Sequence, residues 1–399
     1  MARAGLDVLV LERRGRVGGA VASEELVPGF TFSTCAYALH LLHERVVDEL
    51  GLELDLIESP EPTVLLPDGA ALRADESGAR ALGELDAWRA WDRGWDEGAT
   101  LVDGTLLGEP PLWESLDSPL ADVSMTQLLE RHFELPEARA LFDRLYFEGD
   151  PDEPGGPLAY AYVETSRKRD ARVKGVPRGG MGEVADAFAR AADDAGARVH
   201  VCSEVLRMHP TVVVADGRQL TARAVLVNAA PDDPRPRGPR GAKVHCALRG
   251  EPDLSRLGVE REELGVVAVR DDDGSLVELQ LPSLRDESLA PPGCHTLSIF
   301  MPKALPDALA RAERAIPNLR DIVAAVVEHG PDELERRVGL RVGQVHHVPH
   351  VPAAMFDRRG GARTEVEGVY RCGAAAHPGG EVSGIPGWNA AQAVLADLT

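Results

Sequence analysis

The sequence predicts an α/β fold in which two domains are each assembled from separated segments of the chain. Strand and glycine-loop signals of a nucleotide-binding domain recur three times: at the start, at residues 176–230, and at residues 368–399. The two stretches between them mix strand patterns with helix patterns. Since layers of one domain can be built from non-consecutive segments, we expect the three regions to share one domain and the insertions to form the second.

The first region opens with a short apolar strand. Residues 6–11 (LDVLVL) are followed by an acid, Glu12. A short run rich in valine and leucine is typical of a buried parallel strand, and residues 1–5 are interpreted as the end of a helix that precedes it. A short helix closed by Gly51 is predicted at 45–52. The pair Asp68 and Gly69 then predicts a hairpin turn within 63–73.

Residues 80–148 carry helical spacing and most of the tryptophans. Trp88, Trp91 and Trp95 are spaced i, i+3, i+7, which places them on one helix face and predicts a core stripe. A loop rich in proline, glycine and acids follows at 150–157.

From residue 176 the pattern returns to short alternating elements. A helix is predicted at 183–195, a strand at 198–202, and strands at 211–214 and 219–227 around the hairpin signal Asp216-Gly217. Residues 231–241 are rich in proline, arginine and glycine and predict a crossing between domains. Two further helices are expected at 304–315 and 319–328, and the last segment indicates a strand, a glycine-rich loop and a helix.

Composition excludes several classes of function. Lys plus Arg is 43 and Asp plus Glu is 65, so the net charge is −22. This acidity argues against a nucleic-acid binder and against broad attachment to anionic membranes, although a local apolar membrane contact stays open. No apolar run reaches the roughly 18 residues of a membrane helix, and the first residues lack the apolar core of a signal peptide. Five dispersed cysteines without a Cys-x-x-Cys pair favour a reducing, cytoplasmic location.

Glu12 is the first candidate ligand residue. An acid that ends the second strand of a Rossmann-type fold bonds a ribose hydroxyl, and the pyrophosphate loop lies about 20 residues earlier. Counting back from Glu12 passes Met1, so we expect the first residues to belong to the end of the first helix. Arg13, Gly18 and Gly19 follow, and adjacent glycines beside arginines let a backbone approach a phosphate. The alternative is an exposed glycine turn with solvated arginines.

The C-terminal segment carries the most specific pattern. A strand at 369–371 leads into Gly373, then into the loops 377–380 and 384–387, and a helix runs through 389–398. The N-terminus of a helix is an anion site because its N–H groups and its dipole favour negative charge. Reduced flavin develops negative charge on its pyrimidine edge, which such a helix end could stabilise. A loop that merely caps a terminal helix is the alternative.

Taken together, these motifs resemble a known family. The segments Glu12-Arg13…Gly18-Gly19-Ala20, 29–37, 176–181 and 372–384 are similar to those of phytoene desaturase-related flavoproteins, in particular the pyridine nucleotide-disulfide oxidoreductase domain-containing protein 2 subgroup. The resemblance spans nearly the whole chain and is weakest at 80–170 and 240–350, where the chain is also short. It implies a Rossmann-like FAD-binding domain, N-terminally truncated here, and a mixed sheet-and-helix substrate domain.

The resemblance also implies roles for individual residues. Glu12 would bind the adenosine ribose, Arg13 would lie by the adenine, and Val205 would contact the adenine through its backbone. The remaining cofactor positions are Gly18, Gly19 and Ala20 on the pyrophosphate and ribityl path, Gly373 at the ribityl chain, and Gly384, Ile385 and Pro386 at the pyrimidine edge. Glu381 and the bulky Trp388 depart from what a phosphate loop and a helix start would favour.

Catalytic candidates are few. His377 and Tyr37 are expected near the flavin, yet a histidine bonded to a backbone carbonyl and a packed tyrosine with a satisfied hydroxyl are the default interpretations. His346, His347 and His350 lack acids or cysteines at ligand spacing, so no metal site is predicted. The acid run 271–273 before Gly274 is interpreted as a solvated turn. No nucleophile and base combination indicates hydrolysis.

We therefore expect FAD-binding segments at 1–62, 175–235 and 361–399 and substrate-domain segments at 63–174 and 236–360. The expected activity is FAD-dependent removal of hydride from a C–C or C–N bond of an apolar small molecule. A flavin-dependent isomerase, a degenerate non-catalytic homologue with a binding or scaffolding role, and a dehydrogenase that uses only a nicotinamide are the alternatives. The oligomeric state stays open.

One expectation concerns cofactor affinity. Pyrophosphate binding in this fold depends on backbone N–H groups of the first glycine loop. Without that loop, two or three charge-assisted hydrogen bonds of about 1.5–3 kcal/mol each would be lost. We therefore expect the 399 residues alone to bind FAD weakly, and an upstream strand with Gly-x-Gly-x-x-Gly to restore binding.

Overall fold

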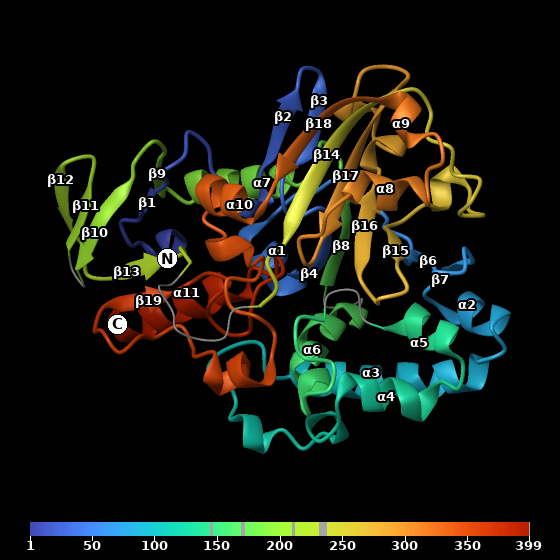
Figure 1. Ribbon diagram of the computed structural model, residues 1–399. Helices are drawn as coiled ribbons and strands as arrows, with labels where there is room; N and C mark the ends of the chain where they lie inside the picture. Colours follow the sequence, from blue (N-terminus) through green and yellow to red (C-terminus); the bar gives the residue numbers. More distant parts are fainter. Residues whose placement is uncertain (144–146, 169–171, 210–211, 231–237, 399) are drawn as a thin grey trace.

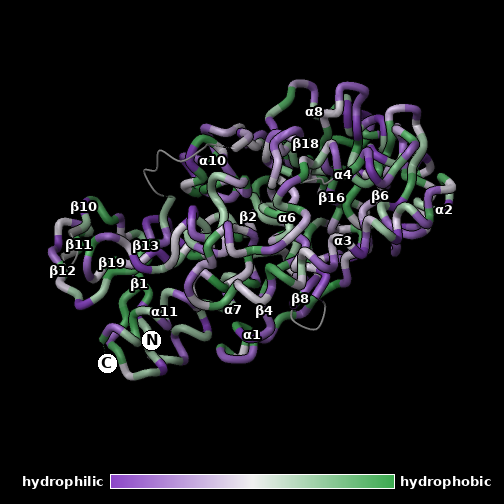
Figure 2. The backbone as a smooth tube through the Cα atoms, turned by 90° about the horizontal axis from the view of Figure 1, so that it is seen from below, coloured by the Kyte–Doolittle hydropathy of each residue, from purple (hydrophilic) through white to green (hydrophobic). Residues whose placement is uncertain are grey.

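The computed structural model describes residues 1–143, 147–168, 172–209, 212–230 and 238–398. Figure 1 shows a small lobe of short strands at one end, a large sheet on the other side, and a layer of helices beneath that sheet. The view from below in Figure 2 shows an elongated molecule with α2 (Glu76–Ala81) at one end. At the opposite end lie β10 (Val205–His209), β11 (Val212–Ala215) and β12 (Arg218–Thr221).

The three regions with nucleotide-binding signals come together in space. β1 (Leu9–Leu11) pairs in parallel with β9 (Arg198–His200), and β13 (Val225–Val227) pairs in parallel with β19 (Val369–Arg371). One apolar cluster joins side chains from all three regions: Met1, Leu6, Leu226, Tyr370 and Val394. The predicted parallel strand is thus confirmed at 9–11, preceded by a single 3-10 turn at Ala2–Ala4. The exact domain boundaries stay a prediction.

A seven-stranded sheet is the largest sheet among the described residues, and it combines strands from the early and the late parts of the chain. Its order is β18 (Val323–His329), β14 (Ala242–Arg249), β17 (Cys294–Met301), β16 (Leu276–Gln280), β15 (Val267–Arg270), β6 (Thr63–Leu65) and β7 (Ala71–Arg73). Only β6 and β15 pair in parallel; the other neighbours are antiparallel. The turn at Asp68-Gly69 joins β6 to β7 as predicted. β14 and β17 are buried almost throughout, because helices and other strands cover both faces of the sheet.

Helices cover the end of this sheet near β6 and β15. They are α2, α3 (Leu85–Asp103), α4 (Met125–His132), α5 (Pro136–Phe142) and α6 (Gly156–Glu164). The tryptophan stripe lies on α3: Trp91 and Trp95 are buried and Trp88 is partly buried. Trp91 packs edge-on against Trp95 and Phe133. The predicted core stripe of tryptophans is therefore confirmed, because 3.6 residues per turn bring these three positions to the same helix face.

Smaller elements connect the two halves. The remaining strands are β2 (Ser23–Val27), β3 (Phe30–Ser33), β4 (Leu39–His43), β5 (Leu56–Ile57) and β8 (Arg172–Pro177), and the β10 (Val205–His209), β11 (Val212–Ala215) and β12 (Arg218–Thr221) lobe. The remaining helices are α1 (Glu44–Leu50), α7 (Gly182–Asp194), α8 (Ala308–Glu313), α9 (Leu319–Ile322), α10 (Pro331–Val338) and α11 (Ile385–Leu398). Gly51 ends α1 in the left-handed conformation, as predicted.

Some boundaries predicted from the sequence were wrong. Instead of a helix at 319–328, α9 ends at Ile322 and β18 follows, because alternate side chains of that strand are covered and its backbone pairs with β14. The strand predicted at 219–227 is two strands: β12 pairs with β11, whereas β13 pairs with β19. Residues 210–211 and most of the predicted crossing at 231–241 lie outside the described residues.

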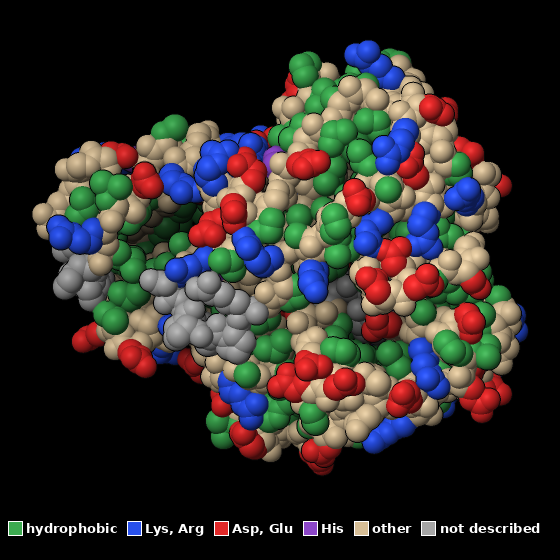
Figure 3. All heavy atoms as spheres, viewed as in Figure 1, with side chains coloured by type: hydrophobic (Ala, Val, Ile, Leu, Met, Phe, Trp, Pro, Cys, Tyr) green, Lys and Arg blue, Asp and Glu red, His purple; other side chains and the backbone are tan. Residues whose placement is uncertain are grey.

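Two surface properties bear on partners. Within the described residues, every helix is too short or too polar to cross a membrane. Figure 3 shows acidic and basic side chains interspersed over one face, so the excess of acids does not gather there in a single patch.

Candidate functional site

The end of β1 is tied to the segment that leads into β10. The backbone N–H of Glu12 donates to the carbonyl of His200, and the carbonyl of Glu12 accepts from the N–H of Ser203 at 2.8 Å. Val205 begins β10 only two residues later and is 41% exposed. The carboxylate of Glu12 accepts a 2.7 Å hydrogen bond from the backbone N–H of Arg14. The structure thus brings Glu12 and the start of β10 close together.

The glycine pair after β1 has the backbone conformation that favours glycine. Gly18 has φ 110° and Gly19 has φ 51°. A Cβ on Gly18 would lie 2.9 Å from that of Ala185 on α7, so this glycine permits close packing of the loop on the helix. A Cβ on Gly19 would meet nothing within 4 Å. The carbonyl of Ala20 accepts a hydrogen bond of 3.0 Å from the N–H of Ala36.

Two arginines converge beside this loop on one carboxylate. Glu24 forms ion pairs with Arg14 at 2.5 Å and with Arg337 from α10. Burial raises the pKa of Glu24, but the hydrogen bonds and charges of the arginines outweigh it and lower that pKa overall. Arg13, by contrast, is exposed and donates to the carbonyl of Arg336. The sequence pointed to Arg13; the structure places Arg14 next to the glycine loop, with its guanidinium 3.4 Å from the carbonyl of Gly19.

The C-terminal glycines serve close packing as well. A Cβ on Gly373 would clash with the side chain of Asn228, and one on Gly384 (φ 74°) would lie 2.9 Å from Val46. α11 begins at Ile385, so Ile385 and Pro386 form its first turn rather than a loop before it. Proline suits that turn because it has no N–H to leave unpaired.

The two sequence features that departed from the family pattern have partners. The indole of Trp388 donates to Glu49 at 2.8 Å, and the guanidinium of Arg45 lies over its ring. Its bulk thus faces α1. Glu381 accepts a hydrogen bond from His346 at 2.9 Å. Contacts within the protein therefore account for both residues.

The N-terminal and C-terminal loops meet. Val21 and Val382 belong to one apolar cluster with Leu39, Leu42 and Met181. The N–H of His43 also donates to the carbonyl of Ser383, one residue before Gly384. The expectation that the separated glycine loops share a site agrees with these contacts.

His377 and Tyr37 have ordinary partners. Nε2 of His377 lies 2.8 Å from the carbonyl of Thr105, and burial lowers its pKa to about 4, so its ring is neutral near neutrality. The hydroxyl of Tyr37 donates to Glu278 at 3.1 Å. The default interpretation, a histidine bonded to a backbone carbonyl, therefore fits His377. The partner of Tyr37, however, is a buried carboxyl group, which gives that tyrosine a titratable neighbour.

Sequence reasoning missed two titratable residues beside Tyr37. Burial raises the pKa of Glu278 to about 8 and lowers that of Lys243 to about 8. The ammonium group of Lys243 donates to the carbonyls of Ser33 and Cys35 and lies 5.4 Å from the ring centre of Tyr37. A lysine inside the apolar strand pattern of β14 was the only sequence signal available for this group.

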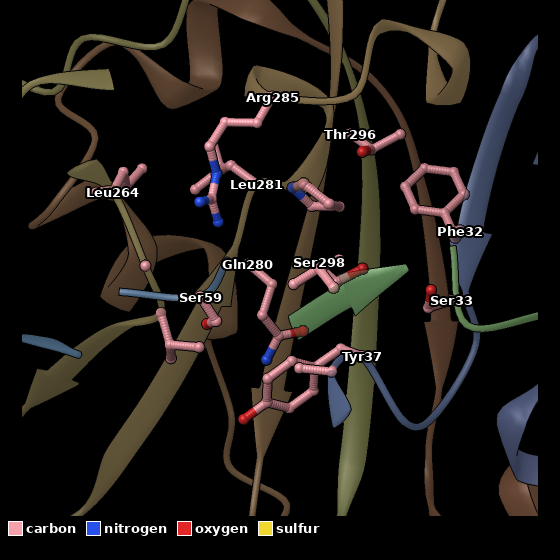
Figure 4. Close-up of a pocket in the computed structure, with 15 residues that line it drawn as sticks. Phe32, Ser33, Tyr37, Ser59, Leu264, Gln280, Leu281, Arg285, Thr296 and Ser298 are labelled. Carbon is pink, nitrogen blue, oxygen red and sulfur yellow. The ribbon is translucent and has the colours of Figure 1, made fainter. Parts of the chain in front are cut away.

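A pocket lies next to Tyr37, between the large sheet and the segment that carries β3. Figure 4 shows the ring of Tyr37 beside the amide of Gln280, with Arg285 and Phe32 on other walls. Apolar side chains line much of it: Phe32, Ala38, Val176, Leu264, Val266 and Leu281. The amide of Gln280 and the hydroxyl of Thr296 are buried there without a hydrogen-bond partner in the part of the chain that the structure describes. The pocket therefore offers an apolar lining with a few polar groups that can bind a ligand.

The comparisons with known proteins agree with this geometry. The family model described as flavin containing amine oxidoreductase matches residues 1–395. The chain belongs to this family. It is 26% identical over 530 aligned positions to pyridine nucleotide-disulfide oxidoreductase domain-containing protein 2 of Mus musculus, covering 99% of this chain and 90% of that protein. The predicted resemblance is thus confirmed.

A second curated relative is a desaturase. The hydroxyneurosporene desaturase of Cereibacter sphaeroides is 25% identical, with 100% of this chain and 94% of that protein covered. Among solved structures, wild-type putrescine oxidase bound to putrescine has a TM-score of 0.65 and 19% identity over 100% of this chain and 95% of that one. That identity shows the fold alone. Together with the family match, these findings make the protein an FAD-dependent oxidoreductase.

The residues of this chain fit FAD. A strand ends at an acid, a loop of left-handed glycines lies beside two arginines, and the N-terminus of a fourteen-residue helix follows Gly384. The family's cofactor supplies the capacity to accept a hydride.

Proposed function

We propose that the protein oxidises a predominantly apolar small molecule that binds in the pocket beside Tyr37. The lining of this pocket carries the proposal. Besides Tyr37 it has seven apolar side chains, Pro282 among them, and one cationic side chain, Arg285, and it includes no carboxylate among the described residues. A cationic diamine would meet an arginine and no counter-charge there, which disfavours it. Within the family, this pocket favours a desaturase-like activity over oxidation of a charged amine.

One segment of the chain connects the pocket with the proposed cofactor-binding residues. Ser33, Tyr37 and Ala38 line this pocket, and between them the N–H of Ala36 donates to the carbonyl of Ala20 in the first glycine loop. The proposed contacts to FAD remain those of the sequence analysis: Glu12, Arg13, Gly18, Gly19, Ala20, Val205, Gly373, Gly384, Ile385 and Pro386. To these we add Arg14, because its side chain lies at the loop.

Tyr37 and Glu278 provide a path for the proton that leaves a substrate when its hydride is removed. Tyr37 lines the pocket and donates its hydroxyl hydrogen to Glu278. The phenol oxygen would take the substrate proton while its own proton passes to the carboxylate of Glu278. Because its pKa is about 8, Glu278 becomes the carboxylate that can accept this proton only as the pH rises through about 8. The five cysteines are free thiols, which supports the proposed cytoplasmic location.

The proposal is tested by anaerobic reduction of the bound flavin. Protein loaded with FAD is mixed separately with an uncharged polyene, an uncharged apolar ring compound and putrescine, and the loss of visible flavin absorbance is followed. We expect an uncharged apolar compound to reduce the flavin and putrescine to leave it oxidised. Reduction by putrescine alone would contradict the proposed substrate class. Conversion of a polyene without net flavin reduction would favour the isomerase instead.

A further inference from the structure

Two histidines from one loop meet a glutamate that lies 198 residues before the first of them, and all three side chains gather around one carboxylate oxygen of that glutamate. Oε2 of Glu148 lies 2.8 Å from Nδ1 of His346 and 4.0 Å from Nδ1 of His350. One donor atom from each of the three residues lies within 4.8 Å of the other two. All three side chains are at most 8% exposed. The set is thus closed off from solvent and converges on a single point.

His350 is the residue that the protein contacts leave unexplained. It is 1% exposed, and neither ring nitrogen has a hydrogen-bond partner among the described residues. Its ring is stacked on that of His346 and packs edge-on against Tyr162. Buried polar groups in folded proteins are almost always bonded. A ligand that accepts a nitrogen lone pair would satisfy the unprotonated nitrogen of this ring.

We propose that Glu148, His346 and His350 bind one divalent transition-metal ion, of which Zn²⁺ is the simplest example. Zinc binds histidine nitrogen and carboxylate oxygen at about 2.0–2.2 Å in tetrahedral geometry, so its donor atoms lie about 3.3–3.6 Å apart. The observed separations of 2.8 and 4.0 Å lie on either side of this value. To admit the ion, the two stacked rings must rotate so that their lone pairs point to one position. Two histidines and one glutamate form a known zinc ligand set.

Glu381 supplies the outer support that such a site needs. Its carboxylate lies 2.9 Å from Nε2 of His346. A hydrogen bond from Nε2–H to this carboxylate leaves Nδ1 of His346 free of hydrogen and directed at the ion, the usual arrangement for a metal-binding histidine. The glycines just before Glu381 allow this approach, because a Cβ on Gly379 or Gly380 would lie 2.8 Å from the ring of His350 or His346.

The site would fasten three segments together. Glu148 lies between α5 and α6, the histidines follow α10, and Glu381 belongs to the loop before α11. The loop that carries Glu381 is also bonded to Tyr162 on α6 through the carbonyl of Gly380. A bound ion would therefore fix the position of the C-terminal glycine loop relative to the helices.

No metal site was predicted from the sequence because no acid lies close to the histidines along the chain. Glu148 is 198 residues away from His346. An ion pair between His346 and its two glutamates would account for those three residues alone. It would leave His350 without any partner, whereas a metal ion would take up the lone pair of its unprotonated nitrogen.

The test uses the full chain, freed of metal with a chelator and then titrated with Zn²⁺ and, separately, with Co²⁺. We expect one equivalent to bind with a dissociation constant of about 1 μM or lower, and cobalt to show the visible absorption of a tetrahedral site without thiolate bands. The variant His350→Ala should weaken binding at least about 100-fold, and Glu381→Gln about 10- to 100-fold.

The matched control is His347→Asn, the neighbouring histidine, whose ring does not belong to the set and whose positive φ asparagine tolerates. It should bind zinc as the wild type does. Equal binding by wild type and His350→Ala would show adventitious zinc elsewhere and would overturn the proposal. If His350→Ala does not fold, the wild-type titration decides alone: no saturable equivalent, or a cobalt spectrum without tetrahedral bands, also overturns it.

Discussion

The hydroxyl of Tyr37 donates a 3.1 Å hydrogen bond to Oε2 of Glu278, which lies 241 residues later in the chain. Tyr37 follows β3 in the first segment, whereas Glu278 lies in the middle of β16 and is fully buried. Burial disfavours a charged carboxylate, which raises the pKa of Glu278 to about 8. The hydrogen bond connects Tyr37, which lines the pocket, with the carboxyl group of Glu278. The raised pKa of that carboxyl group can be tested by experiment.

We expect Glu278→Gln to make stability less dependent on pH between about 5 and 8. The unfolded carboxyl loses its proton near its ordinary pKa of 4.5, whereas the folded one keeps it up to about 8. The folded state therefore binds more protons in this window, and wild-type stability falls as pH rises. At about 1.4 kcal/mol per pH unit, the difference reaches roughly 3–5 kcal/mol at pH 8. Denaturant unfolding at several pH values measures it.

The control for this experiment is Glu53→Gln, because Glu53 is exposed. It should follow the wild-type curve. The window ends near pH 8 because Lys243, whose pKa burial lowers to about 8, acts in the opposite direction above that pH. Parallel curves for wild type and Glu278→Gln would show that Glu278 has an ordinary pKa.

Tyr37→Phe should slow flavin reduction without releasing flavin. The substitution removes the hydroxyl that donates to Glu278 and keeps the ring that lines the pocket. General acid–base groups contribute about 10²–10⁴-fold to rate. With the proton path intact, the rate of reduction should rise through about pH 8; in Tyr37→Phe and Glu278→Gln this rise should vanish. Stopped-flow absorbance measures it, and an unchanged pH profile would remove Tyr37 from the mechanism.

Trp91→Ala should lower the free energy of unfolding by about 3–5 kcal/mol, the usual cost of emptying a buried aromatic site. Trp91 is 2% exposed and packs edge-on against Trp95 and Phe133. The matched control is Trp88→Ala on the same helix, because Trp88 is only partly buried. Chemical denaturation of both variants tests the difference, and equal losses would show that the α3 stripe is not packed as described.

Gly384→Ala should destabilise the C-terminal loop, whereas Gly387→Ala should be neutral or stabilising. Gly384 has φ 74°, and an added Cβ would lie 2.9 Å from Val46. Gly387 lies inside α11, and its Cβ would meet only an ordinary contact of 3.7 Å. Alanine in a helix is favoured over glycine by about 0.8–1 kcal/mol. Melting temperatures of the two variants should shift in opposite directions; a tolerated Gly384→Ala would show that the loop can adopt another conformation.

Glu12→Gln should weaken FAD binding about 10- to 150-fold, the equivalent of one charged hydrogen bond of about 1.5–3 kcal/mol. Glu12 directly follows β1, its carbonyl accepts a hydrogen bond from Ser203, and its carboxylate accepts one from the backbone N–H of Arg14. Quenching of flavin fluorescence during titration gives the dissociation constant. Glu53→Gln again serves as the control, and equal affinity of both variants would assign the ribose to another residue.

The sequence predicted those elements whose causes are local. The strand at β1, the turn at Asp68-Gly69, the end of α1 at Gly51 and the tryptophan face of α3 each follow from spacing or from one residue's backbone preference. The helix expected at 319–328 failed because short valine-rich segments fit a strand equally well, and pairing with β14 decided between them.

Family, cofactor and the convergence of the three nucleotide-binding segments could be predicted from the sequence, because Glu12, the glycine pairs and Gly384 keep a fixed order and spacing that the fold requires. Only the tertiary structure brought Glu278 to Tyr37, Arg337 to Glu24, and Glu148 to His346. Those pairs are joined across 198 to 313 residues by packing of the sheet and helices; burial then raises the pKa of Glu278, whereas the arginines lower that of Glu24. No local pattern encodes a contact of that range, because the free energy that fixes it comes from the assembled core rather than from neighbouring residues.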